Sequence, residues 1–392
     1  MNVISKYFKG DPVLWICIIF LSLLGVAGVY SATGSLAFAK RGGDTEYYLL
    51  RHSVFIIFGF LVMYFCQMMD YRYFSRIAQL LLILSFVLLP ITLAIGDDTN
   101  DAQRRLTILG ITFQTSDLAK VSLIMFIARY LSKHQDRVNE LKTLAPILVC
   151  IIVMCLFIAP ENLSTALVLF ATCFLLLFIG RISLKYLGIL FGSGILVAVI
   201  GVIFLMNVSI DGWAKGTRVP TWKARIENYF DDTQEDAVQV IQAKIAVSTG
   251  GLVGKGPGNS TQRVFLPHSY SDFMFAFMIE EYGLIGGISI ILAYLVILFR
   301  TIRIVIKSPK AFGALLAVGL GFFLCIQAFI HMGVAVSLLP VTGLTLPLVS
   351  WGGTSIVFNS IAFGAILSVS KFIDDGENGE TQSTNKKEVS NA

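Results

Sequence analysis

The feature that most constrains this chain is a series of apolar runs, each about 20 residues long, which recur almost from one end of the sequence to the other. A helix of that length spans the hydrocarbon core of a bilayer, whereas a buried strand is far shorter. Hydrophobic residues make up 56% of the chain and charged residues only 14%. We therefore predict an all-α, polytopic membrane protein, and these proportions exclude a soluble enzyme, a fibrous protein and a disordered chain.

About ten segments are long and apolar enough to be membrane-spanning helices. They lie near residues 13–32, 52–69, 77–95, 116–132, 143–159, 164–180, 185–206, 273–299, 311–335 and 346–370. The first run follows Lys6 and Lys9, as in a signal peptide, but it is long enough to be retained as a helix. The chain is thus divided into a transmembrane domain, 1–373, and a polar tail, 374–392, which is predicted to be cytoplasmic and disordered.

The distribution of positive charge gives the expected orientation. Lys and Arg gather in the short loops on the cytoplasmic side of membrane proteins, and an N-terminus placed inside assigns 17 of the 30 Lys and Arg residues to that side. Both termini are therefore predicted to be cytoplasmic. The formal net charge of +5 is dispersed and forms no dense block, so nucleic acid is not an expected partner. All six cysteines lie in apolar runs, which predicts neither a disulfide framework nor a zinc site.

One external segment, residues 207–271 between the seventh and eighth spans, is much longer than a connection needs to be, and such loops are usually functional. Apolar residues at Ala237, Val240, Ile241 and Ile245 predict an amphipathic helix over 236–249, which either lies on the membrane face or packs on the bundle. The glycine-rich stretch 250–260 follows. Its spacing is not that of a nucleotide-binding loop, and the pattern favours turn geometry over phosphate contact.

Acidic residues follow directly. Asp272 precedes the apolar helix at 273, where it either caps the helix N-terminus or acts in catalysis, and the local pattern favours capping. Glu280 and Glu281 lie about two turns further along, at membrane depth. Carboxyl groups at that depth face the bundle interior or a water-filled cavity rather than lipid.

Two further groups of polar residues fall within apolar spans. Asp117 and Lys120 are three residues apart on one helix face, which favours either a buried ion pair or a substrate contact. Near the last two spans, Gln327 and His331 precede residues 338–355, in which Pro, Gly and hydroxyl side chains alternate with apolar ones. Irregular backbone at membrane depth must lie against protein or a cavity, so these residues are expected to line one.

Four blocks of this sequence together resemble the SEDS family of bacterial shape, elongation, division and sporulation proteins, over nearly the whole chain. The blocks are Phe113-Gln-Thr-Ser-Asp-Leu-Ala-Lys120, the segment from Gln239 to Ser260, Leu266-Pro-His-Ser-Tyr-Ser-Asp272 through Gly283, and Leu339-Pro-Val-Thr-Gly through Ser355. The stretch 327–340 is more similar to the division branch of the family than to the elongation branch.

The resemblance implies a peptidoglycan glycosyltransferase that polymerises lipid II into β-1,4 glycan strands. Its setting would be the bacterial cytoplasmic membrane, with the active site on the outer side. The implied partners are lipid II, the nascent glycan, a class B penicillin-binding protein and other division proteins.

The resemblance also implies roles for individual residues. The family's invariant aspartate corresponds to Asp272, which would be the general base for the acceptor 4-hydroxyl. Substrate binding falls to Arg51, Arg104, Arg105, Gln114, Lys120, Gln242 and Ser350. Asp117, Glu280, Glu281, Gln327 and His331 would shape the cavity. Family behaviour also suggests a divalent cation, Mg²⁺ or Mn²⁺, although no motif in this sequence predicts a metal site.

Several residues depart from the family pattern: Leu106 replaces a tryptophan, Thr115 a proline, Asp117 a glutamate and Trp351 a tyrosine. Two other functions remain open from sequence. The chain would be a lipid II flippase if its intramembrane acids and Lys120 form a proton relay, or a non-catalytic scaffold that activates a penicillin-binding protein.

Overall fold

The computed structural model describes residues 9–34, 36–37, 44–95, 97–98, 103–108, 111–207, 223, 235–265 and 270–390. Within these ranges the chain is almost entirely helical. The long helices of the bundle are α2 (Pro12–Ala32), α4 (Thr45–Met68), α5 (Tyr71–Ile95), α6 (Thr115–Lys133), α7 (Leu141–Ile158), α8 (Leu163–Ile179), α9 (Leu184–Asn207), α12 (Met274–Lys307), α13 (Ala311–Ala335) and α14 (Thr354–Ser390).

These helices confirm an all-α, multi-pass membrane fold. In the described part of the chain, eight helices are long and apolar enough to cross a membrane. Helix α8 is apolar but shorter, with 17 residues, and α6 is long enough but carries Asp117 and Lys120. Each predicted run overlaps one of the bundle helices, while the count of ten spans stays a prediction.

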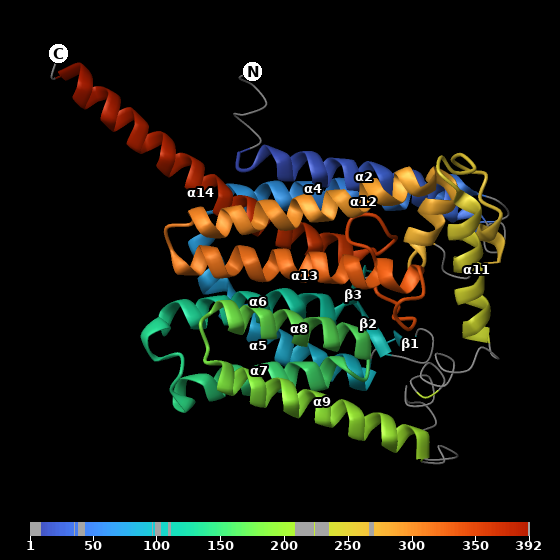
Figure 1. Ribbon diagram of the computed structural model, residues 1–392, viewed down its shortest axis with the longest axis horizontal. Helices are drawn as coiled ribbons and strands as arrows, with labels where there is room; N and C mark the ends of the chain where they lie inside the picture. The colour runs from blue at the N-terminus through green and yellow to red at the C-terminus, as the bar shows by residue number, and fades with distance from the viewer. Residues whose placement is uncertain are drawn as a thin grey trace.

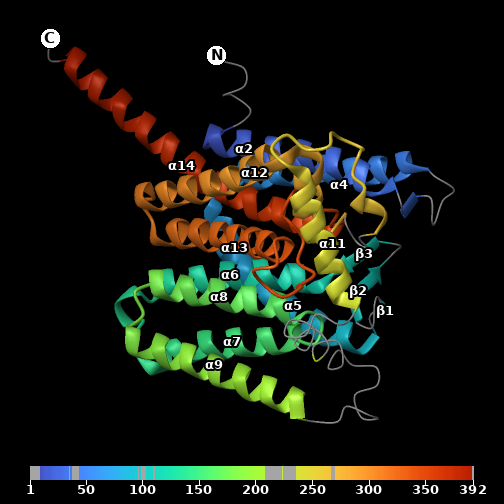
Figure 2. The same cartoon turned by 45° about the vertical axis from the view of Figure 1, so that its right-hand side comes forward.

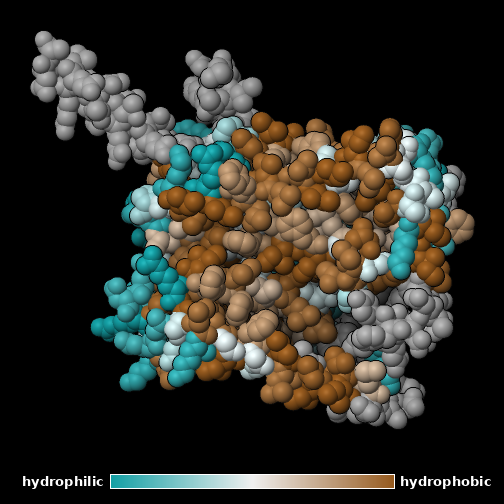
Figure 3. Space-filling view, in the orientation of Figure 1, coloured by the Kyte–Doolittle hydropathy of each residue, from teal (hydrophilic) through white to brown (hydrophobic). Residues whose placement is uncertain are grey.

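The bundle has two distinct ends (Figure 1). Both termini emerge at one end, and the opposite end carries a helix, α11 (Glu235–Gly250), together with a small sheet (Figure 2). On the face that Figure 3 shows, apolar residues cover the helices between these ends, and hydrophilic residues gather toward the ends. Large apolar side chains such as Ile16, Leu80 and Leu184 are exposed, as expected for a surface that meets lipid. Helix α13 and the first part of α14 are mostly buried, so they form the centre of the bundle.

Several predicted boundaries are wrong in the same direction, because helices continue beyond the apolar run. Helix α4 begins at Thr45 rather than near 52, and the carboxylate of Asp44 caps it by accepting from the N–H of Tyr47 (3.1 Å). Helix α12 continues to Lys307 instead of ending near 299. In these two helices the helical hydrogen bonds extend past the apolar run, so the run is shorter than the helix.

A three-stranded antiparallel sheet lies between α5 and α6, where no strands were predicted. Its strands are β1 (Asp97–Asp98), β2 (Gln103–Ile108) and β3 (Ile111–Gln114), in the order β1-β2-β3. Arg105 is opposite Gln114 in the register of β2 and β3. Strand β3 runs directly into α6, so the sheet is fixed to the start of that helix.

The last predicted span, 346–370, is wrong at its beginning. Residues 337–353 between α13 and α14 form turns and extended backbone, and α14 begins only at Thr354. Leu348 lies in this segment with a φ of +65°, a conformation that non-glycine residues rarely adopt. At its other end α14 continues to Ser390, whereas the sequence predicts disorder after 373. This extension leaves the bundle (Figure 1), and helices without packing partners are marginal in water, so the disorder of the tail stays a prediction.

Candidate functional site

Asp272 lies immediately before α12, at the end of the bundle that carries α11 and the sheet. Its side chain is half-buried, and Oδ1 accepts a hydrogen bond from Ser271 Oγ (2.9 Å). The N-cap residue of α12 is Phe273, and no side chain caps this helix from that position. The capping role that the local pattern favours for Asp272 is therefore wrong, and its carboxylate is available for another function.

The backbone around Asp272 is held by the irregular segment between α13 and α14. Ser350 Oγ donates to the carbonyl oxygen of Ser271 (2.8 Å), and the N–H of Trp351 donates to the carbonyl oxygen of Tyr270 (2.9 Å). Gly343, in the same segment, has a φ of +65°, and a Cβ there would lie 3.5 Å from Asp272 Oδ2. Ser350 was predicted to bind substrate. In the structure its hydroxyl group instead donates its hydrogen to the carbonyl oxygen of Ser271.

Side chains from two helices bind three carbonyl groups of that segment. Tyr294 Oη of α12 donates to the carbonyl oxygen of Pro347 (2.5 Å). From α13, Gln327 Nε2 donates to the carbonyl oxygen of Thr345 (2.8 Å), and His331 Nδ1 lies 2.7 Å from that of Leu344. Buried carbonyl groups outside regular structure need such partners. These three residues therefore fix the backbone conformation of residues 344–347.

An aromatic cluster adjoins the same segment. The ring of Trp351 is stacked on that of His52 at 5.6 Å and meets Tyr48 edge to face at 5.8 Å. His52 and Tyr48 are buried residues of α4, and Trp351 is half-exposed. Arg51, a predicted substrate-binding cation, precedes His52 in α4 and is exposed. His52 is not among the predicted site residues, because the sequence around a lone histidine in an apolar run does not indicate which residue it contacts.

The sheet contributes the other predicted cations. Arg104 and Arg105 lie in β2, while the positions of their side chains fall outside the described residues. Gln114 ends β3, and its N–H donates to Thr354 Oγ1 at the start of α14 (3.4 Å). Arg105 thus pairs with Gln114 in the sheet, and Gln114 bonds to Thr354 at the start of α14. These contacts connect β2 to the segment that holds the backbone before Asp272.

Asp117 and Lys120 form the predicted pair inside α6. Lys120 Nζ lies 2.6 Å from Asp117 Oδ1, and both residues are buried. The amine also lies 5.5 Å from the centre of the Phe323 ring. Because Lys120 is neutralised within its own helix, the structure supports the buried ion pair more than a direct substrate contact.

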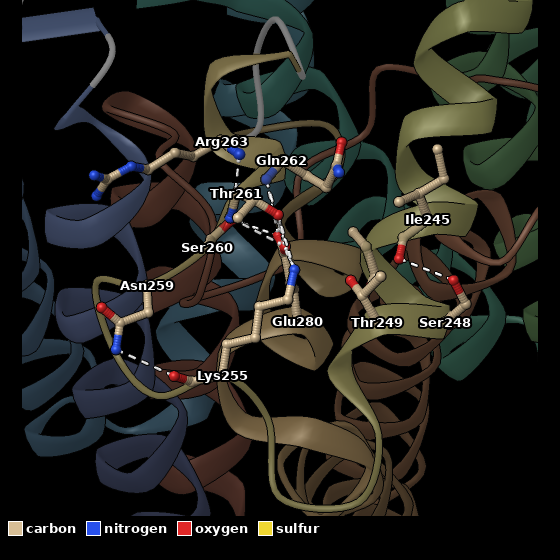
Figure 4. Close-up of polar contacts among 11 residues, drawn as sticks. Ile245, Ser248, Thr249, Lys255, Asn259, Ser260, Thr261, Gln262, Arg263 and Glu280 are labelled. Carbon is tan, nitrogen blue, oxygen red and sulfur yellow. Dashed lines mark hydrogen bonds and ion pairs between the residues drawn. The ribbon is translucent and has the colours of Figure 1, made fainter.

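The two buried glutamates of α12 bind the glycine-rich loop, and Figure 4 shows the contacts of Glu280. Glu280 Oε1 accepts from Lys255 Nζ (2.5 Å) and from Thr261 Oγ1 (2.9 Å), and Ser260 Oγ donates to the other carboxylate oxygen. Glu281 Oε1 accepts from the N–H of Gly258 (2.9 Å) and from Ser31 Oγ of α2. Both carboxylates thus hold residues 255–262 against the bundle.

The same loop fills a break in α12. Gly283 has a φ of +69°, so the helix is interrupted there. The N–H groups of Lys255 and Gly256 donate to the carbonyls of Glu280 and Glu281, and those of Leu284 and Ile285 donate to the carbonyls of Gly251 and Leu252. The loop therefore provides the backbone partners that an interrupted helix lacks.

Helix α11 confirms the helix predicted over 236–249, and of the two predicted placements it packs on the bundle, through small residues. Ala243, Ala246 and Gly250 are buried, whereas Ile241 is 44% exposed. A Cβ on Gly250 would lie 2.2 Å from the carbonyl oxygen of Ile279, so the approach to α12 requires small residues. Gln242, predicted to bind substrate, is half-buried beside this face.

The residues present do not form a complete metal site. Within the described ranges, no group of three or more His, Cys, Asp or Glu side chains is placed to hold a metal ion. A divalent cation near Asp272 would need phosphate or water for most of its ligands, so the cation stays a proposal.

Comparisons with known proteins agree with this architecture. Residues 11–374 match the sequence model of the FtsW/RodA/SpoVE family, described as "Cell cycle protein". A relative from Geobacter sp. (strain M18), "Probable peptidoglycan glycosyltransferase FtsW", is 32% identical over 92% of this chain and 96% of its own. "Stage V sporulation protein E" of Bacillus subtilis (strain 168) is 31% identical over 94% and 99%.

Solved structures show the same fold. A chain from a structure titled "Structural coordination of polymerization and crosslinking by a peptidoglycan synthase complex" superposes with a TM-score of 0.72 and 23% identity, covering 93% of this chain and 98% of that one. The rod shape determining protein RodA of Thermus thermophilus gives a TM-score of 0.64 at 22% identity, covering 93% and 98%. With a family match over nearly its whole length and relatives above 30% identity, this chain belongs to the FtsW/RodA/SpoVE family.

Proposed function

We propose that this protein is a peptidoglycan glycosyltransferase that polymerises lipid II during cell division, with Asp272 as the general base. The observation that carries the proposal is the placement of Asp272, whose half-buried carboxylate does not cap α12 and whose preceding backbone is held by Ser350 and Trp351. The names of the FtsW relatives support the reaction class.

The chemistry requires one base. Chain extension must remove a proton from the 4-hydroxyl of the acceptor sugar, and a positioned carboxylate contributes about 10²–10⁴-fold to such a step. An α-linked donor gives a β-linked product by a single inversion, so no second carboxylate is needed as a nucleophile. The bond that breaks joins the donor sugar to undecaprenyl pyrophosphate, whose charge must be stabilised as it leaves.

Arginines are the best candidates to bind this leaving group, because a guanidinium binds phosphate in a bidentate manner. Arg51 is exposed and precedes His52, and Arg105 lies in the strand bonded to β3. Lys120 is a weaker candidate, since Asp117 would first have to release it.

The proposal also includes a partner and an orientation. A class B penicillin-binding protein would cross-link the glycan, in keeping with the peptidoglycan synthase complex that contains the similar fold. Both termini lie at one end of the bundle and the start of α12, which Asp272 precedes, lies at the other, so cytoplasmic termini would place Asp272 at the outer surface, where the growing glycan lies.

The decisive experiment uses Asp272→Asn protein, purified with its partner and supplied with lipid II. We expect glycan polymerisation to fall by at least about 10²-fold while lipid II still binds. Asp44→Asn is the matched control, because it removes a carboxylate at the same end of the bundle and asparagine also caps helices. Polymerisation at the normal rate by Asp272→Asn would contradict the assignment.

The transporter function has less support. A proton relay would need the intramembrane charges to face a shared path. Asp117 and Lys120 instead pair within α6, and Glu280 and Glu281 bond to residues 255–262 and to Ser31. Loss of polymerisation with normal lipid II flipping in Asp272→Asn would separate the two functions.

A further inference from the structure

The imidazole of His331 joins two segments that meet at Asp272. It is 1% exposed in the middle of the bundle. Its Nδ1 lies 2.7 Å from the carbonyl oxygen of Leu344, in the segment that holds Asp272. On its other side, Nε2 lies 3.4 Å from the backbone N of Phe275, which is three residues after Asp272.

These two partners determine where the proton of the ring resides. A carbonyl oxygen can only accept a hydrogen bond, so Nδ1 must carry the hydrogen. A backbone N–H can only donate, so Nε2 must present its lone pair. A doubly protonated ring would direct a hydrogen at the N–H of Phe275, and a ring protonated at Nε2 would lose both bonds.

The bond to Phe275 also satisfies a backbone N–H group at the start of α12. The first N–H groups of a helix have no partner within the helix, and the N-cap residue of α12 makes no side-chain hydrogen bond to them. His331 reaches from α13 to accept one of these donors. Gln327, one turn earlier on the same helix, donates to the next carbonyl, that of Thr345 (2.8 Å).

We infer that His331, as a neutral ring protonated at Nδ1, is a positioning residue that sets the orientation of Asp272 by fastening the start of α12 to residue 344. Ser350 and Trp351 hold the backbone just before Asp272, and His331 holds it just after. His331 acts through the backbone and does not touch substrate. The inference rests on the proposed function only for the consequence in catalysis; the tautomer does not depend on it.

The tautomer is tested directly by nitrogen NMR of the whole protein labelled with ¹⁵N-histidine. The chain has four histidines, and comparison with a His331→Asn sample identifies the resonances of His331. Couplings from the ring hydrogens distinguish the two nitrogens. We expect a neutral ring with the proton on Nδ1 at neutral pH. A proton on Nε2, or on both nitrogens, would overturn the inference even in a protein that polymerises lipid II normally.

The positioning role is tested by pairing two substitutions. Asparagine has both a donor and an acceptor, whereas leucine fills similar space with neither. We expect His331→Leu to lower kcat about 10- to 100-fold, because displacement of a catalytic group by about 1 Å costs about 10²-fold. KM for lipid II should stay within about twofold, and His331→Asn should recover much of the lost kcat.

Equal turnover in wild type and His331→Leu would refute the positioning role, as would a change confined to KM. If His331→Leu does not fold, Gln327→Met provides the second variant, since it removes the neighbouring bond to Thr345 while filling similar space. Gln327→Met should then lower kcat at unchanged KM, and normal kcat would refute the role. Failure of the proposed function would appear differently, as a wild-type protein without polymerase activity whose His331 ring is still protonated at Nδ1.

Discussion

At the scale of single residues, the bonding of Ser350 illustrates what a motif leaves undetermined. The resemblance assigned this serine to substrate, yet its Oγ accepts from the N–H of Leu346 (3.0 Å) and donates to the carbonyl of Ser271 (2.8 Å). A hydroxyl has one proton to donate, and here that proton is already used. A sequence gives the type of residue at a position, whereas its bonding partner depends on a segment about 80 residues away in the chain.

Ser350→Ala should therefore destabilise the protein as well as slow the reaction. The N–H of Leu346 and the carbonyl of Ser271 would lose their partner, and an unpaired buried group costs about 1–3 kcal/mol. We expect a lower unfolding temperature in detergent and reduced polymerisation. Ser248→Ala is the control, since this exposed serine bonds only within its own helix turn and should change stability by less than about 0.5 kcal/mol. Equal stability of the two variants would contradict the role given to Ser350.

The Asp117–Lys120 pair leads to a second prediction at this scale. Asp117→Leu should destabilise the protein by about 3–5 kcal/mol, because it leaves the buried Lys120 amine without its counter-charge. The double variant Asp117→Leu/Lys120→Met should recover most of that loss, since an apolar pair needs no charge compensation. Thermal unfolding of both variants measures the difference. If the double variant is as unstable as the single one, the pair has a role beyond mutual neutralisation.

At the scale of elements, the helices and the irregular segment before α14 were predictable, whereas the break at Gly283 was not. A run of about 20 apolar residues has few alternatives in a membrane, so the spans could be found from sequence. The Pro, Gly and hydroxyl residues of 338–355 indicated irregular backbone, and Tyr294, Gln327 and His331 bind carbonyl groups of that segment. The break at Gly283 lies within an apolar run, and its bonds come from residues 251–256, which composition does not reveal.

Two glycines of the loop separate the cost of backbone strain from that of a steric clash. Gly254 and Gly258 have similar φ values, +87° and +82°. A Cβ on Gly254 would lie 2.2 Å from the carbonyl oxygen of Glu281, whereas none of the described atoms lies within 4 Å of a Cβ on Gly258. Gly258→Ala should cost about 1–2 kcal/mol from strain alone. Gly254→Ala should cost clearly more and displace the loop, as measured by unfolding temperature and by proteolysis of residues 251–263.

At the scale of the whole molecule, the orientation in the membrane is the property open to the simplest test. Val253 lies in the loop at the end that carries α11, and Lys310 lies at the opposite end, between α12 and α13; both are exposed. In intact cells, a membrane-impermeant maleimide should label Val253→Cys but not Lys310→Cys. Labelling of Lys310→Cys should appear after the cells are opened. The opposite pattern would place Asp272 on the cytoplasmic side and contradict the proposed function.

The break at Gly283 also changes which parts of the molecule form one rigid piece. The first turns of α12 share their backbone hydrogen bonds with residues 251–256, and their carboxylates hold residues 258–262. Asp272 therefore belongs to a compact part of the chain that consists of the end of α11, the glycine loop and the beginning of α12. The remainder of α12 is anchored elsewhere: Arg300 pairs with Asp11 at the far end of the bundle. The break thus divides α12 into two mechanically separate parts, and a movement of α11 would be passed through the glycine loop to Asp272, the proposed base, rather than through the membrane-spanning part of α12.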